Sequence, residues 1–253
     1  MVRQSPWLYP AAIGVLVSLF LFLFLFFPAG GYADNAPQPK AVFPKGARIL
    51  FQGDSITDGN RGRSLDPNHI LGHGYAFIIA AKYGGDFPEK QYVFLNRGIS
   101  GNKVTDLQRR WGSDTLDLKP DVLSILIGVN DNVSVPLDEY EKIYDSLLTD
   151  VETANPKTVL VLCEPFTLPV GGVKGNWDTW KSGIDARRKI VAGLATKHHA
   201  ALVEFQKVFD AAAKRAPAEY WIWDGVHPTY SGHQLMADAW MKTVQSFLTR
   251  RER

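Results

Sequence analysis

Residue types suited to acyl transfer lie near both ends of the chain. The tetrapeptide 53–56 (Gly-Asp-Ser-Ile) directly follows a short apolar run, and segment 223–229 contains Asp224 and His227, three residues apart. A serine hydroxyl is a weak nucleophile unless an imidazole removes its proton, and a third group must hold that imidazole in one tautomer. An aspartate on the same tight loop can bind Nδ1–H and leave Nε2 free for the serine. This pattern predicts a triad of Ser55, His227 and Asp224.

Each of these motifs also has a purely structural interpretation. Gly-Asp-Ser is a common turn sequence, and Asp224 could instead cap the helix that follows it, with His227 as an ordinary surface residue. Ser100, in Gly-Ile-Ser-Gly-Asn, is a second candidate nucleophile. It lacks the Gly-x-Ser-x-Gly elbow of the α/β-hydrolases, and so does the rest of the chain.

Two further segments offer hydrogen-bond donors for an oxyanion. Segments 98–102 and 128–131 are rich in glycine and asparagine, which are also the residues that any turn after a strand would use. A tetrahedral intermediate needs several donors around its oxygen. The backbone N–H groups of Ser55 and Gly101 and the side-chain amide of Asn130 would provide three, so the segments together favour an acyl-transfer site.

The elements that must position these residues alternate between strands and helices. Because helices separate consecutive strands, the pattern predicts one α/β domain with a parallel sheet and helices on both faces. Ligands bind beyond the carboxyl ends of the strands in such sheets, and the candidate residues follow predicted strands. Strands are expected at 48–52, 92–96, 121–128, 158–162 and 201–204, and helices at 74–83, 103–110, 137–154, 178–199 and 230–250.

In this order, the four segments resemble the sequence blocks of the SGNH hydrolase superfamily, also called the GDSL esterases. The signature Ser, Gly, Asn and His of that family match Ser55, Gly101, Asn130 and His227, the last in an Asp-x-x-His pattern with Asp224. The resemblance implies a flavodoxin-like three-layer α/β/α sandwich with a five-stranded parallel sheet. It also implies that Ser55, Asp224 and His227 form the triad, with Ser55, Gly101 and Asn130 as the oxyanion hole.

The same resemblance implies a serine esterase for short O-acyl groups, in the first place O-acetyl groups on carbohydrate. The substrate would then be a small-molecule or polysaccharide ester. The aromatic residues Trp177, Trp180, Trp221 and Trp223 could stack on sugar rings, although core packing is the ordinary role of such side chains. A lysophospholipase or short-chain thioesterase remains an alternative, as does a carbohydrate-binding protein without catalysis.

The amino terminus differs from the rest of the chain. Residues 1–33 combine Arg3, an apolar run over 11–27 and a small-residue exit at Ala33, which indicates a signal peptide or an uncleaved membrane anchor. The stretch 34–46 is polar and rich in Pro and Ala, as in a flexible linker, and 47–253 is expected to be the catalytic domain. The protein should therefore be secreted or periplasmic, or else anchored to the membrane by this segment.

Several other functions find no support in the sequence. The charge of +2 comes from nearly balanced signs, without the basic stripe of a nucleic-acid-binding protein. We expect neither a metal nor another cofactor, because no His-Glu-x-x-His or similar ligand spacing occurs. Cys163, the single cysteine, should be a small buried residue at a strand end. Segment 171–176 should be a mobile surface loop, and His198, His199 and His233 should be surface residues or helix C-terminal partners rather than ligands.

Overall fold

The computed structural model describes residues 40–64 and 66–251, with a parallel five-stranded sheet at its centre. The strand order β2-β1-β3-β4-β5 is that of the flavodoxin-like folds. The predicted fold class is therefore confirmed. The strands are β1 (Arg48–Gly53), β2 (Val93–Asn96), β3 (Val122–Leu126), β4 (Val159–Cys163) and β5 (Ala201–Val203).

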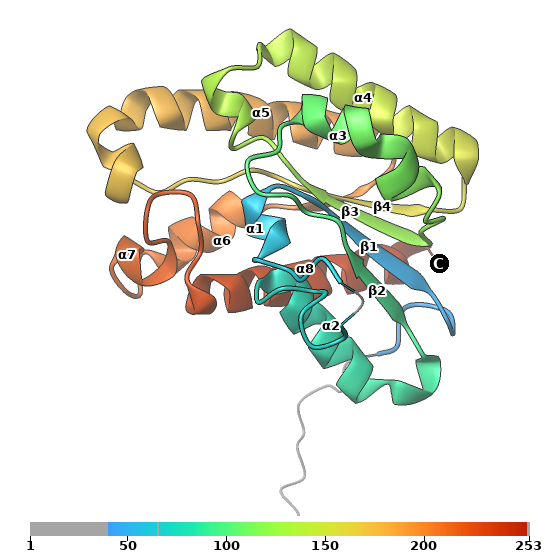
Figure 1. Cartoon of the computed structure of the whole chain (residues 1–253). Helices are drawn as coiled ribbons and strands as arrows, with labels where there is room; N and C mark the ends of the chain where they lie inside the picture. The colour runs from blue at the N-terminus through green and yellow to red at the C-terminus, as the bar shows by residue number, and fades with distance from the viewer. Residues whose placement is uncertain (1–39, 65, 252–253) are drawn as a thin grey trace, which may run out of the picture. The chain divides into compact units, whose positions relative to one another are not determined.

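Helices cover both faces of this sheet, with α3, α4 and α5 on one side and α2, α6 and α8 on the other (Figure 1). The long helices lie within a few residues of their predicted positions. Helix α6 was not predicted, although its buried Phe205 and Phe209 have helical spacing. The helices are α1 (Ser55–Asp58), α2 (Tyr75–Asp86), α3 (Val104–Trp111), α4 (Leu137–Ala154), α5 (Trp177–Lys197), α6 (Phe205–Ala212), α7 (Ala218–Trp221) and α8 (Tyr230–Arg251), with short turns η1 (Pro88–Lys90), η2 (Gly112–Leu116), η3 (Asp131–Val133) and η4 (Gly171–Asn176).

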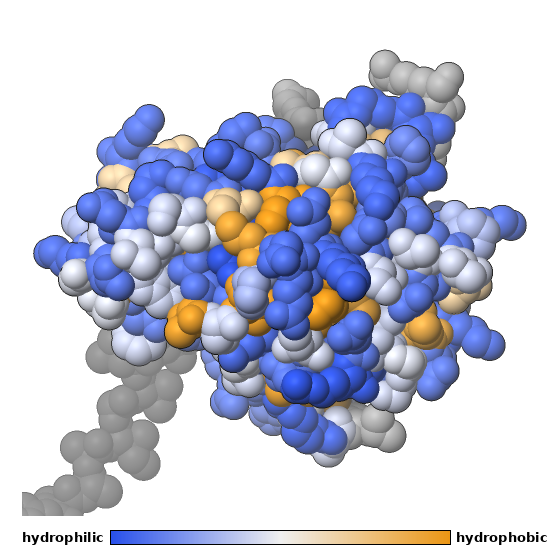
Figure 2. All heavy atoms as spheres, turned by 90° about the horizontal axis from the view of Figure 1, so that it is seen from above, coloured by the Kyte–Doolittle hydropathy of each residue, from blue (hydrophilic) through white to orange (hydrophobic). Residues whose placement is uncertain are grey.

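The sheet separates two hydrophobic clusters. In β1, Ile49 and Phe51 belong to the cluster under α2 and α8, whereas Leu50 belongs to the cluster under α3 and α4. This alternation follows from the two-residue period of a strand. All residues of β3 are buried, as expected for a central strand covered on both sides. The outer surface on the side of α4 and α5 is mostly hydrophilic, with apolar side chains gathered near its middle (Figure 2).

The folded domain begins earlier than predicted. Phe43 is only 4% exposed, and its ring packs against the rings of Tyr83, Tyr92 and Trp240. The predicted linker 34–46 is therefore wrong at its carboxyl end, because one large apolar side chain there finds a site in the core. Residues 1–39 lie outside the described part, so the signal peptide or anchor stays a prediction. No helix within the described ranges combines the length and apolar character needed to cross a membrane.

The register of the strands brings the candidate residues to one edge. Phe51 of β1 pairs with Asn96 of β2, and Gly53 pairs with Leu126 of β3. The segments that follow these three strands therefore leave the sheet side by side, at its carboxyl edge. Three predicted parts of the site begin there.

Candidate active site

The candidate nucleophile lies at the junction between β1 and α1. Ser55 is the first residue of α1, and the side chain of Asp54 caps this short helix by accepting a hydrogen bond from the Ile56 N–H at 3.0 Å. The N–H of a first helical residue has no acceptor within its helix. Both the hydroxyl and the N–H of Ser55 are therefore available for chemistry at the carboxyl edge of the sheet.

The histidine lies on a tight loop before α8. An antiparallel bridge closes the segment 222–228, and the Trp223 N–H donates to the His227 carbonyl at 3.2 Å. One carboxylate oxygen of Asp224 accepts hydrogen bonds from the N–H groups of Val226, at 3.0 Å, and His227, at 2.7 Å. The aspartate thus shapes the loop that presents the imidazole.

The three predicted triad residues form one hydrogen-bonded chain. Ser55 Oγ lies 2.7 Å from His227 Nε2, and His227 Nδ1 lies 2.6 Å from Asp224 Oδ2. Partial burial would raise the pKa of Asp224, but the two backbone donors and the imidazole outweigh it and lower that pKa below its usual value. Asp224 is therefore ionised at neutral pH, and His227 has a hydrogen-bond partner at each ring nitrogen.

The two predicted oxyanion loops lie against each other. A backbone hydrogen bond from Asn102 to Ile99 closes a turn in which Gly101 has φ of +82°. A turn of type II requires positive φ at its third residue, which explains the glycine. The side-chain amide of Asn130 donates to the Asn102 carbonyl at 3.0 Å, so one of its two hydrogens anchors it to this turn. Its second hydrogen remains for another acceptor.

Residues 51–235 match the GDSL-like Lipase/Acylhydrolase family. The chain belongs to this family. The matched region contains the serine, the histidine loop and both oxyanion loops, so the predicted resemblance is confirmed and the chain is an acylhydrolase.

Relatives of this GDSL acylhydrolase include an esterase. An acetylxylan esterase of Geobacillus stearothermophilus is 33% identical over 213 residues, which are 79% of this chain and 94% of the relative. A solved structure of that esterase has a TM-score of 0.71 at 31% identity, covering 79% of this chain and 95% of the other. Further structures of it carry catalytic mutations of a serine, an aspartate and a histidine to alanine.

Two other solved structures are similar over most of this chain. A protein of Parabacteroides merdae described as a GDSL-like lipase has a TM-score of 0.77 at 41% identity, covering 83% of this chain and 100% of its own. LAE5, an alpha/beta hydrolase enzyme from the metagenome of Lake Arreo, Spain, has a TM-score of 0.72 at 30% identity, covering 83% of this chain and 99% of its own.

Ser100, the rival nucleophile, has a structural role in this acylhydrolase. Its Oγ donates to Asp58 Oδ2 at 3.1 Å, and its N–H donates to the same oxygen at 3.0 Å. Asp58 is buried and also binds the guanidinium of Arg63. Ser100 therefore fixes the loop of Gly101 to α1 and has a carboxylate, not an imidazole, as its partner.

Sequence reasoning missed a second group that holds this loop. The guanidinium of Arg110 donates to the Arg97 carbonyl at 2.8 Å, to Gln52 Oε1 at 2.9 Å and to Asn102 Oδ1 at 2.9 Å. It thereby joins the ends of β1 and β2 to the oxyanion turn. An arginine on an amphipathic helix gives no sequence signal for such a role, because the same residue is common on solvated helix faces.

Two buried carboxyl groups flank the site in sequence, next to Ser55 and Asn130. Desolvation raises the pKa of Asp54 to about 7, against the hydrogen bond from Ile56, and repulsion from Asp131 adds to this rise. Desolvation likewise raises the pKa of Asp131 to about 6, against the hydrogen bond from Val104. These groups therefore resist carrying two negative charges beside the place where the oxyanion would form.

The four predicted aromatic residues occupy different environments. Trp221 is buried, and Trp177 and Trp180 are half-buried. Trp223 is 64% exposed, and its ring stacks beside the His227 ring at 6.4 Å between centroids with 27° between planes. Trp223 is thus the member of this set that offers an open aromatic face next to the triad.

The structure corrects two further predictions. Segment 171–176 is the helical turn η4, not a loop, and its Val173 is buried. His233 is buried within the first turns of α8, where it stacks on Tyr75 and accepts the Tyr75 N–H at 3.2 Å. His198 lies at the carboxyl end of α5, as predicted, but is buried between two carboxylates of α4. These histidines lie inside because each has specific partners, and Cys163 is buried as predicted.

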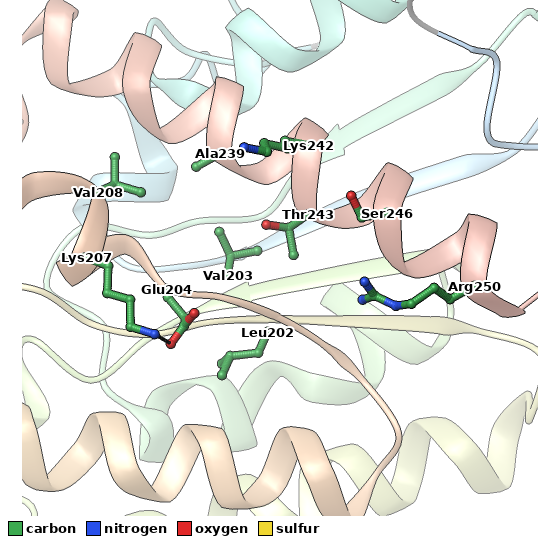
Figure 3. Close-up of a pocket in the computed structure, with 10 residues that line it drawn as sticks. All are labelled: Leu202, Val203, Glu204, Lys207, Val208, Ala239, Lys242, Thr243, Ser246 and Arg250. Carbon is green, nitrogen blue, oxygen red and sulfur yellow. Dashed lines mark ion pairs between the residues drawn. The ribbon is translucent and has the colours of Figure 1, made fainter. Parts of the chain in front are cut away.

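A hollow of about 400 Å³ lies away from the triad, between β5, α6 and α8 (Figure 3). Its lining includes Lys207, which forms an ion pair with Glu204, together with Lys242 and Arg250. It contains none of the triad or oxyanion residues and therefore adds nothing to the candidate active site.

Proposed function

We propose that this acylhydrolase is a serine esterase that removes O-acetyl groups from carbohydrate through Ser55, His227 and Asp224. The observation that carries the proposal is the unbroken chain of contacts from Asp224 through the imidazole to Ser55 Oγ, at 2.6 and 2.7 Å. This is the arrangement that a serine needs for nucleophilic attack.

The first half of the reaction forms an acyl-enzyme. His227 Nε2 takes the proton of the Ser55 hydroxyl, and Oγ forms a bond to the ester carbonyl carbon. The carbonyl oxygen becomes an oxyanion that accepts hydrogen bonds from the N–H groups of Ser55 and Gly101 and from the Asn130 amide. The tetrahedral intermediate then breaks its bond to the leaving alcohol, which receives the proton from His227.

The second half releases the acid. A water molecule gives a proton to His227 Nε2 and attacks the acyl-enzyme carbonyl, and the bond to Ser55 Oγ breaks as the imidazolium returns that proton to the serine. Asp224 remains ionised throughout, because its hydrogen bonds lower its pKa. It holds the imidazole in the tautomer with Nδ1–H and stabilises the imidazolium.

Two observations support a carbohydrate ester as substrate. The relative of known activity that is 33% identical over most of both chains is an acetylxylan esterase. The exposed face of Trp223 lies beside His227, the group that protonates the leaving alcohol. An aromatic face at this position suits stacking on the sugar ring that carries the leaving hydroxyl.

A substitution at the serine tests the catalytic part of the proposal. Ser55→Ala should fold like the wild type but lose hydrolysis of p-nitrophenyl acetate, and a fluorophosphonate should label the wild type alone. Retained hydrolysis in Ser55→Ala would contradict the nucleophile. Absence of both activity and labelling in the wild type would favour a carbohydrate-binding protein without catalysis.

Acyl chain length and the aromatic face test the substrate. We expect activity to fall steeply from p-nitrophenyl acetate to octanoate, whereas a rise toward octanoate would favour a lipid esterase. Trp223→Ala should raise KM for acetylated xylo-oligosaccharides by up to about tenfold, because a stacking contact is lost. Its KM for p-nitrophenyl acetate is the internal control and should change little. An equal change for both substrates would argue against a sugar contact.

A further inference from the structure

A buried arginine clamps the loop that carries Asn130. Arg187 of α5 is only 3% exposed. Its Nη2 donates to the backbone carbonyls of Asp131, at 2.7 Å, and Val135, at 2.6 Å, and its Nη1 donates to Asn132 Oδ1 at 3.0 Å. Three of the five residues that follow Asn130 are thus bound by one guanidinium group.

The opposite side of this loop is bound to the other oxyanion loop and to α3. The Asn130 amide donates to the Asn102 carbonyl at 3.0 Å, and Asp131 Oδ1 accepts the Val104 N–H at 2.8 Å. The loop is therefore fixed from two directions, by α3 and its preceding turn on one side and by Arg187 on the other. Movement of η3 away from α5 would pull directly on the residue before it, Asn130.

The surroundings of Arg187 allow little alternative placement. Its guanidinium carbon lies 5.5 Å from the centre of the Tyr140 ring, and burial lowers its pKa from the usual arginine value. The neighbouring Gly183 gives room for Asn132, because a Cβ there would lie within van der Waals overlap of Asn132 Oδ1. A planar guanidinium that spans two carbonyls and a side-chain amide has no equivalent in another residue type.

We propose that Arg187 is a positioning residue that sets the location of the Asn130 amide for the oxyanion; this inference rests on the proposed esterase function. The hydrogen bonds of the Arg187 side chain go to four residues other than Ser55, His227 and Asn130, namely Asp131, Asn132, Val135 and Gly183. Arg187 acts on the rate through Asn130, because a misplacement of about 1 Å of a catalytic group costs on the order of 10²-fold in rate.

A double-mutant cycle tests the coupling. Arg187→Met should lower kcat for p-nitrophenyl acetate by about 10- to 100-fold with KM within about twofold of the wild type. Asn130→Ala should lower kcat by about 10²–10³-fold. If Arg187 acts through Asn130, adding Arg187→Met to Asn130→Ala should cost less than about threefold more, since the effects of coupled residues do not add.

Two further variants separate positioning from general stability. Lys197→Met removes another cation of the same helix, which is 61% exposed and pairs with Asp145 of α4, and should leave kcat unchanged. Arg187→Lys keeps the positive charge but loses the planar guanidinium that reaches several acceptors at once. This variant should fold, and its kcat should lie between those of the wild type and Arg187→Met. It replaces Arg187→Met in the cycle if the methionine variant is insoluble.

The possible outcomes are distinct. Wild-type kcat in the Arg187 variants, or an equal loss with and without Asn130, would overturn the positioning role while leaving the esterase proposal intact. Wild-type kcat in Asn130→Ala would overturn the oxyanion role and the positioning role together. Activity in Ser55→Ala, or a wild type that has neither activity nor labelling, would refute the proposed nucleophile, so the two failures are told apart.

Discussion

At the residue before the proposed nucleophile, the requirements of fold and of electrostatics conflict. Asp54 caps α1 and thereby places Ser55, yet it is buried and close enough to Asp131 for the two charges to repel. A carboxyl group with a folded-state pKa near 7 stabilises the fold only while it is protonated. The cap that orients the serine therefore costs stability at alkaline pH.

The substitution Asp54→Asn separates these two effects. Asparagine keeps an oxygen for the Ile56 N–H but cannot ionise. Because the pKa of Asp54 is raised from 3.8 to about 7, its stabilising contribution is full below pH 3.8 and is lost as pH rises through 7. Relative to the wild type, the variant should therefore become more stable as pH rises from 5 to 8, by at least about 1 kcal/mol. Urea unfolding of both proteins at pH 5 and pH 8 measures this change. A difference in unfolding free energy that does not vary with pH would contradict the raised pKa.

At the scale of elements, short turns rather than long helices hold Asp224 in place. The Leu168 N–H and the Thr167 hydroxyl donate to the Gly225 carbonyl at 3.0 and 2.9 Å. Gly171, at the start of η4, has φ of +52° and lies so close to Asp224 that a Cβ there would be 2.4 Å from the Asp224 Cα. The segment after β4 and η4 thus form the support on which the loop of Asp224 and His227 rests.

Gly171→Ala should therefore impair catalysis at a distance from the reacting atoms. The added Cβ would overlap the backbone of Asp224, so the loop of Asp224 and His227 must shift. In addition, the left-handed conformation costs alanine about 1–2 kcal/mol. We expect kcat for p-nitrophenyl acetate to fall by about 10²-fold. Gly172→Ala is the matched control, because its Cβ would meet nothing within 4 Å, and it should keep wild-type kcat. Equal activity in both variants would show that η4 does not set the position of Asp224.

For the molecule as a whole, buried ionisable groups make stability depend on pH in opposing ways. Burial lowers the pKa of His233 from 6.5 to about 4, with further lowering by His73 and His227. The unfolded chain then binds a proton at this residue between pH 6.5 and 4 while the folded chain does not, so acidification destabilises the fold. Asp54 and Asp131 act in the opposite direction, because burial raises their pKa values.

A substitution at His233 isolates the contribution of this residue to the pH dependence of stability. His233→Asn offers an oxygen to the Tyr75 N–H in place of Nδ1 but takes up no proton. Relative to the wild type, it should become more stable as pH falls from 7 to 4, by up to about 3 kcal/mol. Chemical denaturation across this range measures the difference. A constant difference would mean that His233 is protonated in the folded protein as readily as in the unfolded chain.

The sequence by itself determined the architecture and the candidate reacting groups. Alternating strands and helices require a parallel sheet, and a parallel sheet brings the segments after its strands to one edge. Ser55, Gly101 and Asn130 could thus be placed together, and Asp224 and His227 are close in sequence. The burial of Phe43 could not be predicted in the same way, because a single apolar residue in a polar segment carries no periodic pattern.

Only the tertiary structure decided what holds these groups in position. Arg187 reaches the Asp131 carbonyl across 56 residues, and Arg110 reaches Gln52 across 58. In the sequence, each looks like a charged residue on the solvated face of a helix. Long-range partners of this kind depend on how the helices pack on the sheet. That packing sets interatomic distances to a fraction of an ångström, and no local sequence pattern encodes such distances.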